Sequence, residues 1–177
     1  DSRVQVLHPF TDDREALERA IGSATSGGST SLYNAVYIAL RQLETLRPPE
    51  GGAIRRNVIV VLSDGEDTSS LLSFDEVLDT AKRSQSVIYT IGLGLDAQPA
   101  RRTASDPEFE LRRLAQETGG RLLVAKDATN LSNVYSQIAD ELTSQYVLGY
   151  LSTGTQRDSW RSLSVRVGRP NLQARTR

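Results

Sequence analysis

Two polar clusters in the sequence could bind a metal ion or a partner molecule. Residues 63–68 follow directly on an apolar run and contain three carboxylates, those of Asp64, Glu66 and Asp67. Residues 27–31 contain two glycines and three hydroxyl groups, and they lie at the predicted start of a helix. Hydroxyl and carboxylate oxygens are hard ligands that suit magnesium, calcium or manganese.

The hydrophobic pattern predicts a fold that brings the two clusters to one edge. Residues 58–62 form a continuous apolar run, which is typical of a strand covered on both faces of a parallel sheet. Such runs alternate with segments of helical periodicity, which predicts a Rossmann-like three-layer α/β/α sandwich with a mostly parallel sheet. Ligands of open α/β sheets bind beyond the carboxyl ends of the strands. The predicted strands are residues 2–10, 58–62, 87–92, 121–125, 146–151 and 163–167, the last two as an antiparallel pair, and the predicted helices begin at Asp12, near Thr30, at Ser73, at Asp106 and near Leu131.

Composition excludes several classes of chemistry. The chain has 177 residues, no cysteine and a single histidine, so disulfides, thiolate catalysis and histidine-rich zinc sites are ruled out. No segment approaches the roughly 20 apolar residues of a membrane span.

The length fits one domain, predicted at residues 1–151, with a basic strand extension at residues 152–177. Because that extension lacks interleaved aromatic and basic residues, nucleic-acid binding is not expected.

Several spaced segments together resemble one protein family. Residues 27–35, 57–68, 88–94, 114–121 and 145–150 are similar, in this order, to the von Willebrand factor type A (VWA) domain, and specifically to the bacterial VWFA-related branch typical of acidobacteria. The similarity covers nearly the whole chain. It implies a VWA-like α/β fold, and it also implies export, because members of this branch are commonly exported. The residues themselves leave the compartment open.

The resemblance implies a particular kind of binding site. VWA domains carry a metal-ion-dependent adhesion site (MIDAS), in which a divalent cation, usually Mg²⁺, completes its coordination with an acidic side chain of a partner protein. By motif position, Thr30 and Asp64 are two of its metal ligands. The partner-binding rim around them would consist of Ser29, Gly65, Glu66 and Asp67. A protein partner is therefore expected, and a small-molecule substrate is not.

The sequence departs from the family at one important motif. The family's Asp-x-Ser-x-Ser segment occurs nowhere in the 177 residues, and Asp1 begins where the third strand of the family would lie. The resemblance therefore implies that the first strands are missing, supplied either by a longer protein or by another chain. On that reading the metal site is incomplete, and this chain alone is expected to bind Mg²⁺, Ca²⁺ or Mn²⁺ weakly or not at all.

Taken without the family, the same residues allow other interpretations. Thr30 could be a helix cap, the turn at Asp64 and Gly65 could be an ordinary turn after a strand, and Glu66 and Asp67 could be solvated loop charges. Two other functions also stay open. One is a metal-assisted hydrolase in which Asp64 and Asp67 hold the cation and Glu66 is the available general base, and the other is a structural domain with a decayed metal site. We expect a binding module and not an enzyme.

Overall fold

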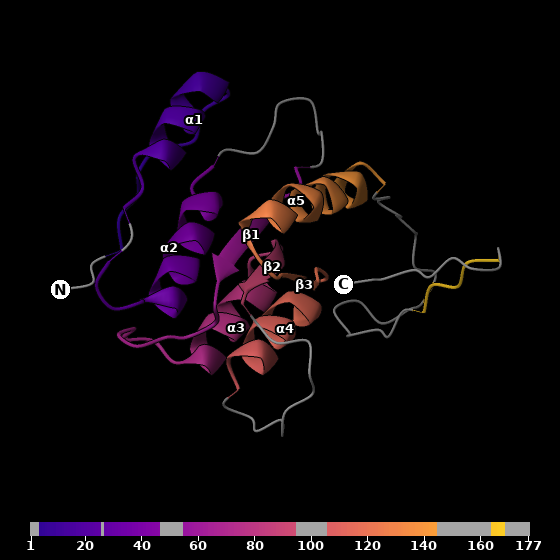
Figure 1. Cartoon of the computed structure of the whole chain (residues 1–177). Helices are drawn as coiled ribbons and strands as arrows, with labels where there is room; N and C mark the ends of the chain where they lie inside the picture. The colour runs from indigo at the N-terminus through magenta and orange to yellow at the C-terminus, as the bar shows by residue number, and fades with distance from the viewer. Residues whose placement is uncertain (1–3, 26, 47–54, 95–105, 145–163, 169–177) are drawn as a thin grey trace.

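The computed structural model describes residues 4–25, 27–46, 55–94, 106–144 and 164–168 (Figure 1). Helices and strands alternate along most of this part of the chain. Their order is α1 (Arg14–Gly22), α2 (Leu32–Glu44), β1 (Val58–Ser63), α3 (Phe74–Arg83), β2 (Val87–Leu93), α4 (Pro107–Glu117), β3 (Leu122–Ala125) and α5 (Ala128–Thr143). Among the described helices, none combines the length and apolar character needed to cross a bilayer.

The three strands form one parallel sheet in the order β1-β2-β3. Val58 lies opposite Val87 at the start of the β1–β2 pair, and Thr90 lies opposite Leu122 in the β2–β3 pair. Helices connect these strands, as parallel pairing requires. The prediction of strands at residues 58–62, 87–92 and 121–125 in a parallel sheet is therefore confirmed.

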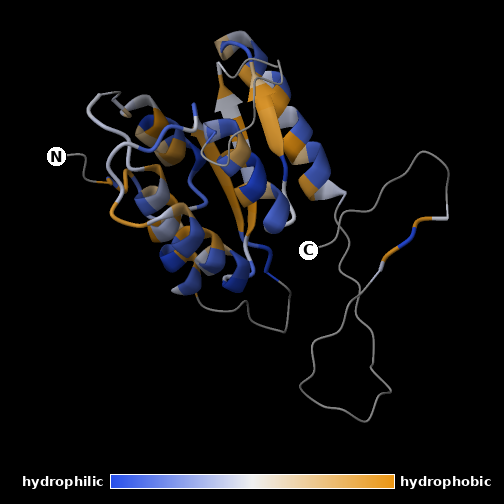
Figure 2. Ribbon diagram, turned by 90° about the horizontal axis from the view of Figure 1, so that it is seen from below, coloured by the Kyte–Doolittle hydropathy of each residue, from blue (hydrophilic) through white to orange (hydrophobic). Residues whose placement is uncertain are grey.

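Helices cover both faces of the sheet, which gives the predicted three layers (Figure 1). On one face, Leu40 of α2, Val77 of α3 and Leu111 of α4 pack in one apolar cluster with Ile88 of β2. On the other face, α5 packs against the next residue of β2, Tyr89. Successive residues of a strand point to opposite faces, so an unbroken apolar run is what a central strand needs. Figure 2 shows the hydrophobic strands enclosed between helices whose outer faces are hydrophilic.

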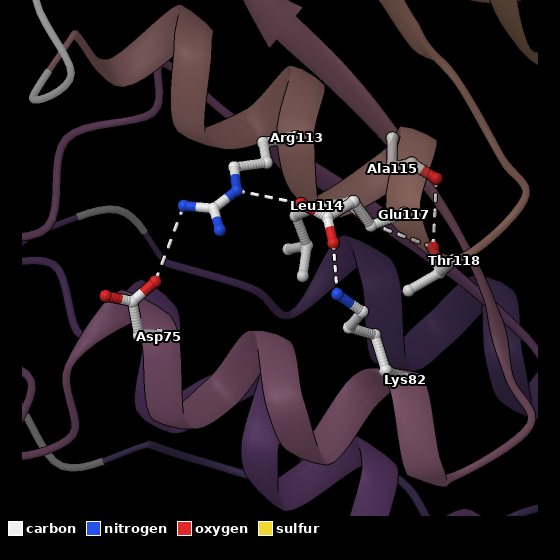
Figure 3. A network of polar contacts seen from close by, with 7 residues as sticks. All are labelled: Asp75, Lys82, Arg113, Leu114, Ala115, Glu117 and Thr118. Atoms are coloured by element: carbon white, nitrogen blue, oxygen red, sulfur yellow. Dashed lines mark hydrogen bonds and ion pairs between the residues drawn. The ribbon is translucent and has the colours of Figure 1, made fainter.

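A charged network on the surface joins α3 to α4 (Figure 3). The Glu117 carboxylate accepts hydrogen bonds from the Lys82 ammonium and from the Arg113 Nε, the latter at 2.8 Å. Arg113 also reaches the Asp75 carboxylate at 3.4 Å. The two cations lower the pKa of Glu117, Lys82 contributing the larger effect. The network therefore fixes α4 next to α3 most firmly when this carboxyl group is ionised.

Thr118, directly after α4, ties that helix to the central strand. Its buried hydroxyl accepts a hydrogen bond from the Ile88 N–H at 3.1 Å and donates to the Leu114 carbonyl at 2.9 Å. Gly120 follows, and a Cβ there would lie 2.0 Å from the Ile88 carbonyl oxygen. The end of α4 thus approaches β2 more closely than any side chain at residue 120 would allow.

Two predicted strands are absent from the described residues. Residues 4–10 alternate like a strand, but they form none in this structure, and Val6, Leu7 and Phe10 are more than half exposed. An alternating segment becomes a strand only where another strand accepts its hydrogen bonds, and the described sheet contains only β1, β2 and β3. Residues 164–167 also form no strand in this structure. The partner predicted for them, residues 146–151, lies outside the described residues, as does most of the predicted extension at residues 152–177.

Three helix starts differ from the prediction by a few residues. Asp13, and not Asp12, caps α1, because its Oδ1 accepts the Ala16 N–H at 3.0 Å. The second helix, α2, begins at Leu32 and not at Thr30, which leaves Thr30 in the loop before it. Helix α5 begins three residues before Leu131, after the capping residue Asp127.

Candidate functional site

The loop after β1 begins with a tight turn at the carboxyl edge of the sheet. The Ser63 hydroxyl accepts the Gly65 N–H at 3.0 Å, and the Asp64 Oδ1 accepts the Glu66 N–H at 3.1 Å. Gly65 is buried with a φ of 90°, and a Cβ on it would lie 2.8 Å from the Pro107 Cβ. Only glycine fits this turn under the start of α4, and the turn leaves the Asp64 side chain exposed to solvent.

The loop before α2 is bonded to the loop after β1 through backbone groups. The Thr30 carbonyl accepts hydrogen bonds from the N–H groups of Thr68 at 2.9 Å and Ser69 at 3.1 Å. The Thr30 N–H in turn donates to the Thr68 hydroxyl at 2.8 Å. Next to it, the hydroxyl groups of Ser31 and Ser69 lie 2.8 Å apart. The structure therefore brings together the two polar clusters, 27–31 and 63–68, that lie far apart in the sequence.

The amino end of α2 is capped by residues of the other loop. Ser31, in the capping position, makes no capping hydrogen bond with its side chain. Instead the Asp67 Oδ1 accepts the Tyr33 N–H at 3.3 Å, and the Ser70 hydroxyl accepts the Asn34 N–H at 3.1 Å. These bonds satisfy two of the free N–H groups at the helix start, and they place a negative charge at the positive end of the helix dipole.

Asp67 holds this arrangement with both of its carboxylate oxygens. Besides the Tyr33 N–H, its carboxylate accepts the Ser70 hydroxyl at 2.6 Å and the Ser70 N–H at 3.2 Å. Asp67 is partly buried, whereas Thr30, Asp64 and Glu66 are exposed. The carboxylate of Asp67 therefore orders the loop, and the exposed oxygens at the rim come from its neighbours.

Tyr33 connects the same loop to α4. Its hydroxyl donates a hydrogen bond to the Glu110 carboxylate, and its ring packs edge-to-face on Phe74 with centroids 5.9 Å apart. Burial and the bond to Glu110 raise the pKa of the Tyr33 hydroxyl above its ordinary value. An open hollow of about 300 Å³ lies between these elements, lined by Tyr33, Gly65, Glu66, Asp67, Thr68, Pro107 and Glu110.

The residues predicted from the sequence occupy different positions at this edge. Ser29 and Thr30 are exposed on one loop, and Asp64 and Glu66 are exposed on the other. Thr30 and Asp64 are brought to adjoining loops, but no hydrogen bond joins their side chains. Gly65 is buried beneath the rim.

The oxygen atoms at this edge are of the type that a hard divalent cation binds, but too few of them are present to fill its coordination. Thr30 and Asp64 supply one hydroxyl and one carboxylate, which are the oxygen ligands that Mg²⁺ takes. Within the described residues, no group of three or more Asp, Glu, His or Cys side chains is arranged to hold a metal ion. A cation at this edge would need further ligands from water or from other groups.

Sequence reasoning missed the residues that fix the geometry of the site. The bonds of Tyr33 to Asp67 and Glu110, and of Ser70 to Asn34, join residues far apart in the chain, and no local pattern marks those contacts. One local signal exists for Asp67, because an Asp three residues before a Ser is a common pattern for side-chain to backbone hydrogen bonds.

Comparisons with known proteins agree with this fold. The family model described as "von Willebrand factor type A domain" matches residues 1–137. Among solved structures, the conserved hypothetical protein BatB from Bacteroides thetaiotaomicron is 17% identical with a TM-score of 0.54, over 78% of this chain and 74% of that chain. An aerotolerance-related membrane protein from Bacteroides fragilis is 19% identical with a TM-score of 0.52, over 77% and 72%.

The VWA domain of SpRpn10 is also similar, at 19% identity and a TM-score of 0.52, over 77% of this chain and 67% of that chain. No curated protein matches the chain. At such low identities, these structures establish a common fold and nothing about what this chain binds.

Proposed function

Because the chain belongs to the von Willebrand factor type A family, whose members often mediate protein interactions, we propose that it is a protein-binding module that uses the carboxyl edge of its sheet. The contact surface is the rim formed by the exposed residues of the segments 27–31 and 63–68. The observation that carries this proposal is the set of hydrogen bonds from Thr30 to Thr68 and Ser69, which holds two polar loops together before any partner arrives. A preorganised rim loses little conformational entropy when it binds.

A divalent cation is part of the proposed recognition. Thr30 and Asp64 would supply two of its oxygen ligands, and water and an acidic side chain of the partner protein would supply others. The cation would be Mg²⁺ in the first instance, with Ca²⁺ or Mn²⁺ as alternatives. Because the chain offers it a single carboxylate, its positive charge is only partly neutralised. An acidic partner group is then the ligand that it lacks, whereas the cation alone binds weakly.

A binding role is favoured over hydrolysis by the position of Asp67. The alternative enzyme requires Asp64 and Asp67 to share a cation that activates water. The Asp67 carboxylate already accepts three hydrogen bonds from Tyr33 and Ser70, and moving it would uncap α2. We therefore propose a site that binds without catalysing a reaction.

Paramagnetic broadening by Mn²⁺ tests the cation part of the proposal, because it detects weak sites. At substoichiometric Mn²⁺, the amide signals of Thr30, Ser31 and Gly65 should broaden first. Asp64→Asn should abolish this selectivity. Asp140→Asn, which removes an exposed carboxylate on α5, should leave it intact. Equal broadening in both variants would reject Asp64 as a ligand.

Selection of peptides from a random displayed library tests the partner part. Peptides recovered on the immobilised chain in Mg²⁺ should be rich in Asp or Glu, should elute with a chelator, and should not be recovered on the Asp64→Asn variant. Acidic peptides that bind equally well with chelator present would show recognition without a cation. A recovered set with no enrichment of Asp or Glu would contradict the proposed partner chemistry.

A further inference from the structure

Leu71, in the loop between the rim and α3, exposes its apolar side chain almost completely. It is 94% exposed, the highest value among the large hydrophobic side chains in the described part of the chain, and Ile21 follows at 74%. Single exposed apolar side chains are common on protein surfaces, and by themselves they do not indicate a binding site. Leu71 differs in two respects, which are how firmly its backbone is held and how near it lies to the rim.

The backbone around Leu71 is fixed to the start of α2 by Asn34. The Asn34 Oδ1 accepts the N–H groups of Leu71 at 3.3 Å and Leu72 at 3.4 Å, and the Asn34 N–H donates to the Ser70 hydroxyl at 3.1 Å. The side chain of Leu72 packs against the apolar cluster of α2, α3 and α4. Turning the Leu71 side chain inward would break these bonds and displace Leu72, so the fold itself keeps Leu71 in solvent.

The same loop brings Leu71 close to the rim. Ser69 donates its N–H to the Thr30 carbonyl at 3.1 Å, and Leu71 lies two residues further along the chain. Because two residues span at most about 7 Å, the Cα atoms of Thr30 and Leu71 lie within about 14 Å of each other. One segment of a partner protein can therefore contact both residues.

We propose that Leu71 is an apolar contact of the partner site, so that the partner protein offers a large apolar side chain near its acidic one. The inference rests on the proposed function, which supplies the acidic group. An extended segment rises about 3.3 Å per residue, which places the two partner side chains no more than about five residues apart. Because the backbone of Leu71 is already ordered, little conformational entropy is lost on binding, and burial of its side chain favours the complex.

Selection from the random displayed peptides tests this partner chemistry. Peptides recovered on the unmodified chain in Mg²⁺ should combine Asp or Glu with Leu, Ile, Met or Phe at a separation of up to about five residues. Acidic peptides without such an apolar residue would overturn the role of Leu71 and leave the proposed function intact. Recovery of no acidic peptide would overturn both.

Fluorescence anisotropy of a recovered peptide measures the contribution of Leu71. Leu71→Ala should weaken binding by at least about tenfold, which corresponds to about 1.4 kcal/mol. Leu71→Met keeps a large apolar side chain and should bind nearly as well as the unmodified chain. Tyr135→Ala is the control, because Tyr135 is 45% exposed on α5, across the sheet from α2 and α3, and it should not change the affinity. Since the Leu71 side chain is exposed, Leu71→Ala should melt like the unmodified chain in circular dichroism.

Comparison with Asp64→Asn separates this inference from the proposed function. If Asp64→Asn abolishes binding and Leu71→Ala binds like the unmodified chain, the cation site stands and the role of Leu71 is wrong. If Leu71→Ala weakens binding and Asp64→Asn does not, the apolar contact stands and Asp64 is not a ligand. Equal weakening by Leu71→Ala and Tyr135→Ala would overturn Leu71 as a contact of the partner.

Discussion

Replacing Asp67 by alanine separates a structural role for this carboxylate from a ligand role. In the structure Asp67 caps α2 from a different loop and holds the Ser70 hydroxyl and N–H. A carboxylate that served only as a ligand would be repelled by its neighbours Asp64 and Glu66, so its removal would stabilise the fold. We expect the opposite sign, a clear loss of stability for Asp67→Ala.

The magnitude follows from the bonds that are lost. Losing an N-cap costs about 0.5–2 kcal/mol, typically about 1. The two bonds to Ser70 contribute about 0.5–1.5 kcal/mol each, and the lower value applies because Asp67 is only partly buried and water can replace its carboxylate. The sum is a decrease of about 2 kcal/mol in the free energy of unfolding, or a melting temperature lower by about 4–8 °C. Asp67→Asn keeps a hydrogen-bond acceptor at the start of α2, so its free energy of unfolding should fall by less than about 1 kcal/mol.

Urea unfolding followed by far-ultraviolet circular dichroism measures these differences. Glu66→Ala is the control, because Glu66 is the adjacent exposed acid and its removal should change stability by no more than about 0.5 kcal/mol. If Asp67→Ala is as stable as Glu66→Ala, the cap contributes nothing. If Asp67→Ala is more stable than the unmodified chain, the ligand role that we reject for Asp67 would be the correct one.

Two further perturbations address the turn and the helix pair that support the site. Gly65→Ala should lower the free energy of unfolding, measured with urea, by about 2–4 kcal/mol, because a left-handed alanine is strained and its Cβ meets Pro107. Gly22→Ala, with open space around it and an ordinary φ, should instead raise the free energy of unfolding by up to about 1 kcal/mol. The pKa of Glu117 is lowered in the folded state by Lys82 and then Arg113, so its stabilising effect is present above its ordinary pKa of about 4.5 and is lost as the pH falls through the lower folded value. The melting temperature of Glu117→Gln should therefore depend less on pH below about 5 than that of the unmodified chain, and equal slopes would contradict the role assigned to this network.

Much of the fold was predictable because its signals are local. The apolar run at residues 87–92 requires cover on both faces, and β2 receives it from helices on either side. The start of α3 follows from Ser73 and Glu76, whose side chains cap each other's backbone. Such patterns lie within a few residues of one another, so a short window of sequence contains the whole interaction.

Predictions failed where the outcome depends on distant parts of the chain. The alternation of Val4, Gln5 and Val6 predicted a strand, but the segment has no neighbouring strand among the described residues. Likewise the sequence places Asp67 in an acidic cluster, but it does not show that the amino end of α2 would occupy that carboxylate. In both cases the outcome depends on contacts with distant residues, which tertiary structure sets.

Contacts between residues far apart in the sequence also explain how the two loops at the carboxyl edge of the sheet can form one binding surface. Thr30 and Asp64 belong to segments separated by a helix and a strand, and each segment alone would be a flexible turn. The bonds of Thr30 to Thr68 and of Asp67 to Tyr33 join the segments into one unit before binding. In the function proposed above, the role of Asp67 is to fix the positions of the exposed oxygens beside it, and a variant that loses this carboxylate should bind an acidic partner more weakly even though Thr30 and Asp64 are unchanged.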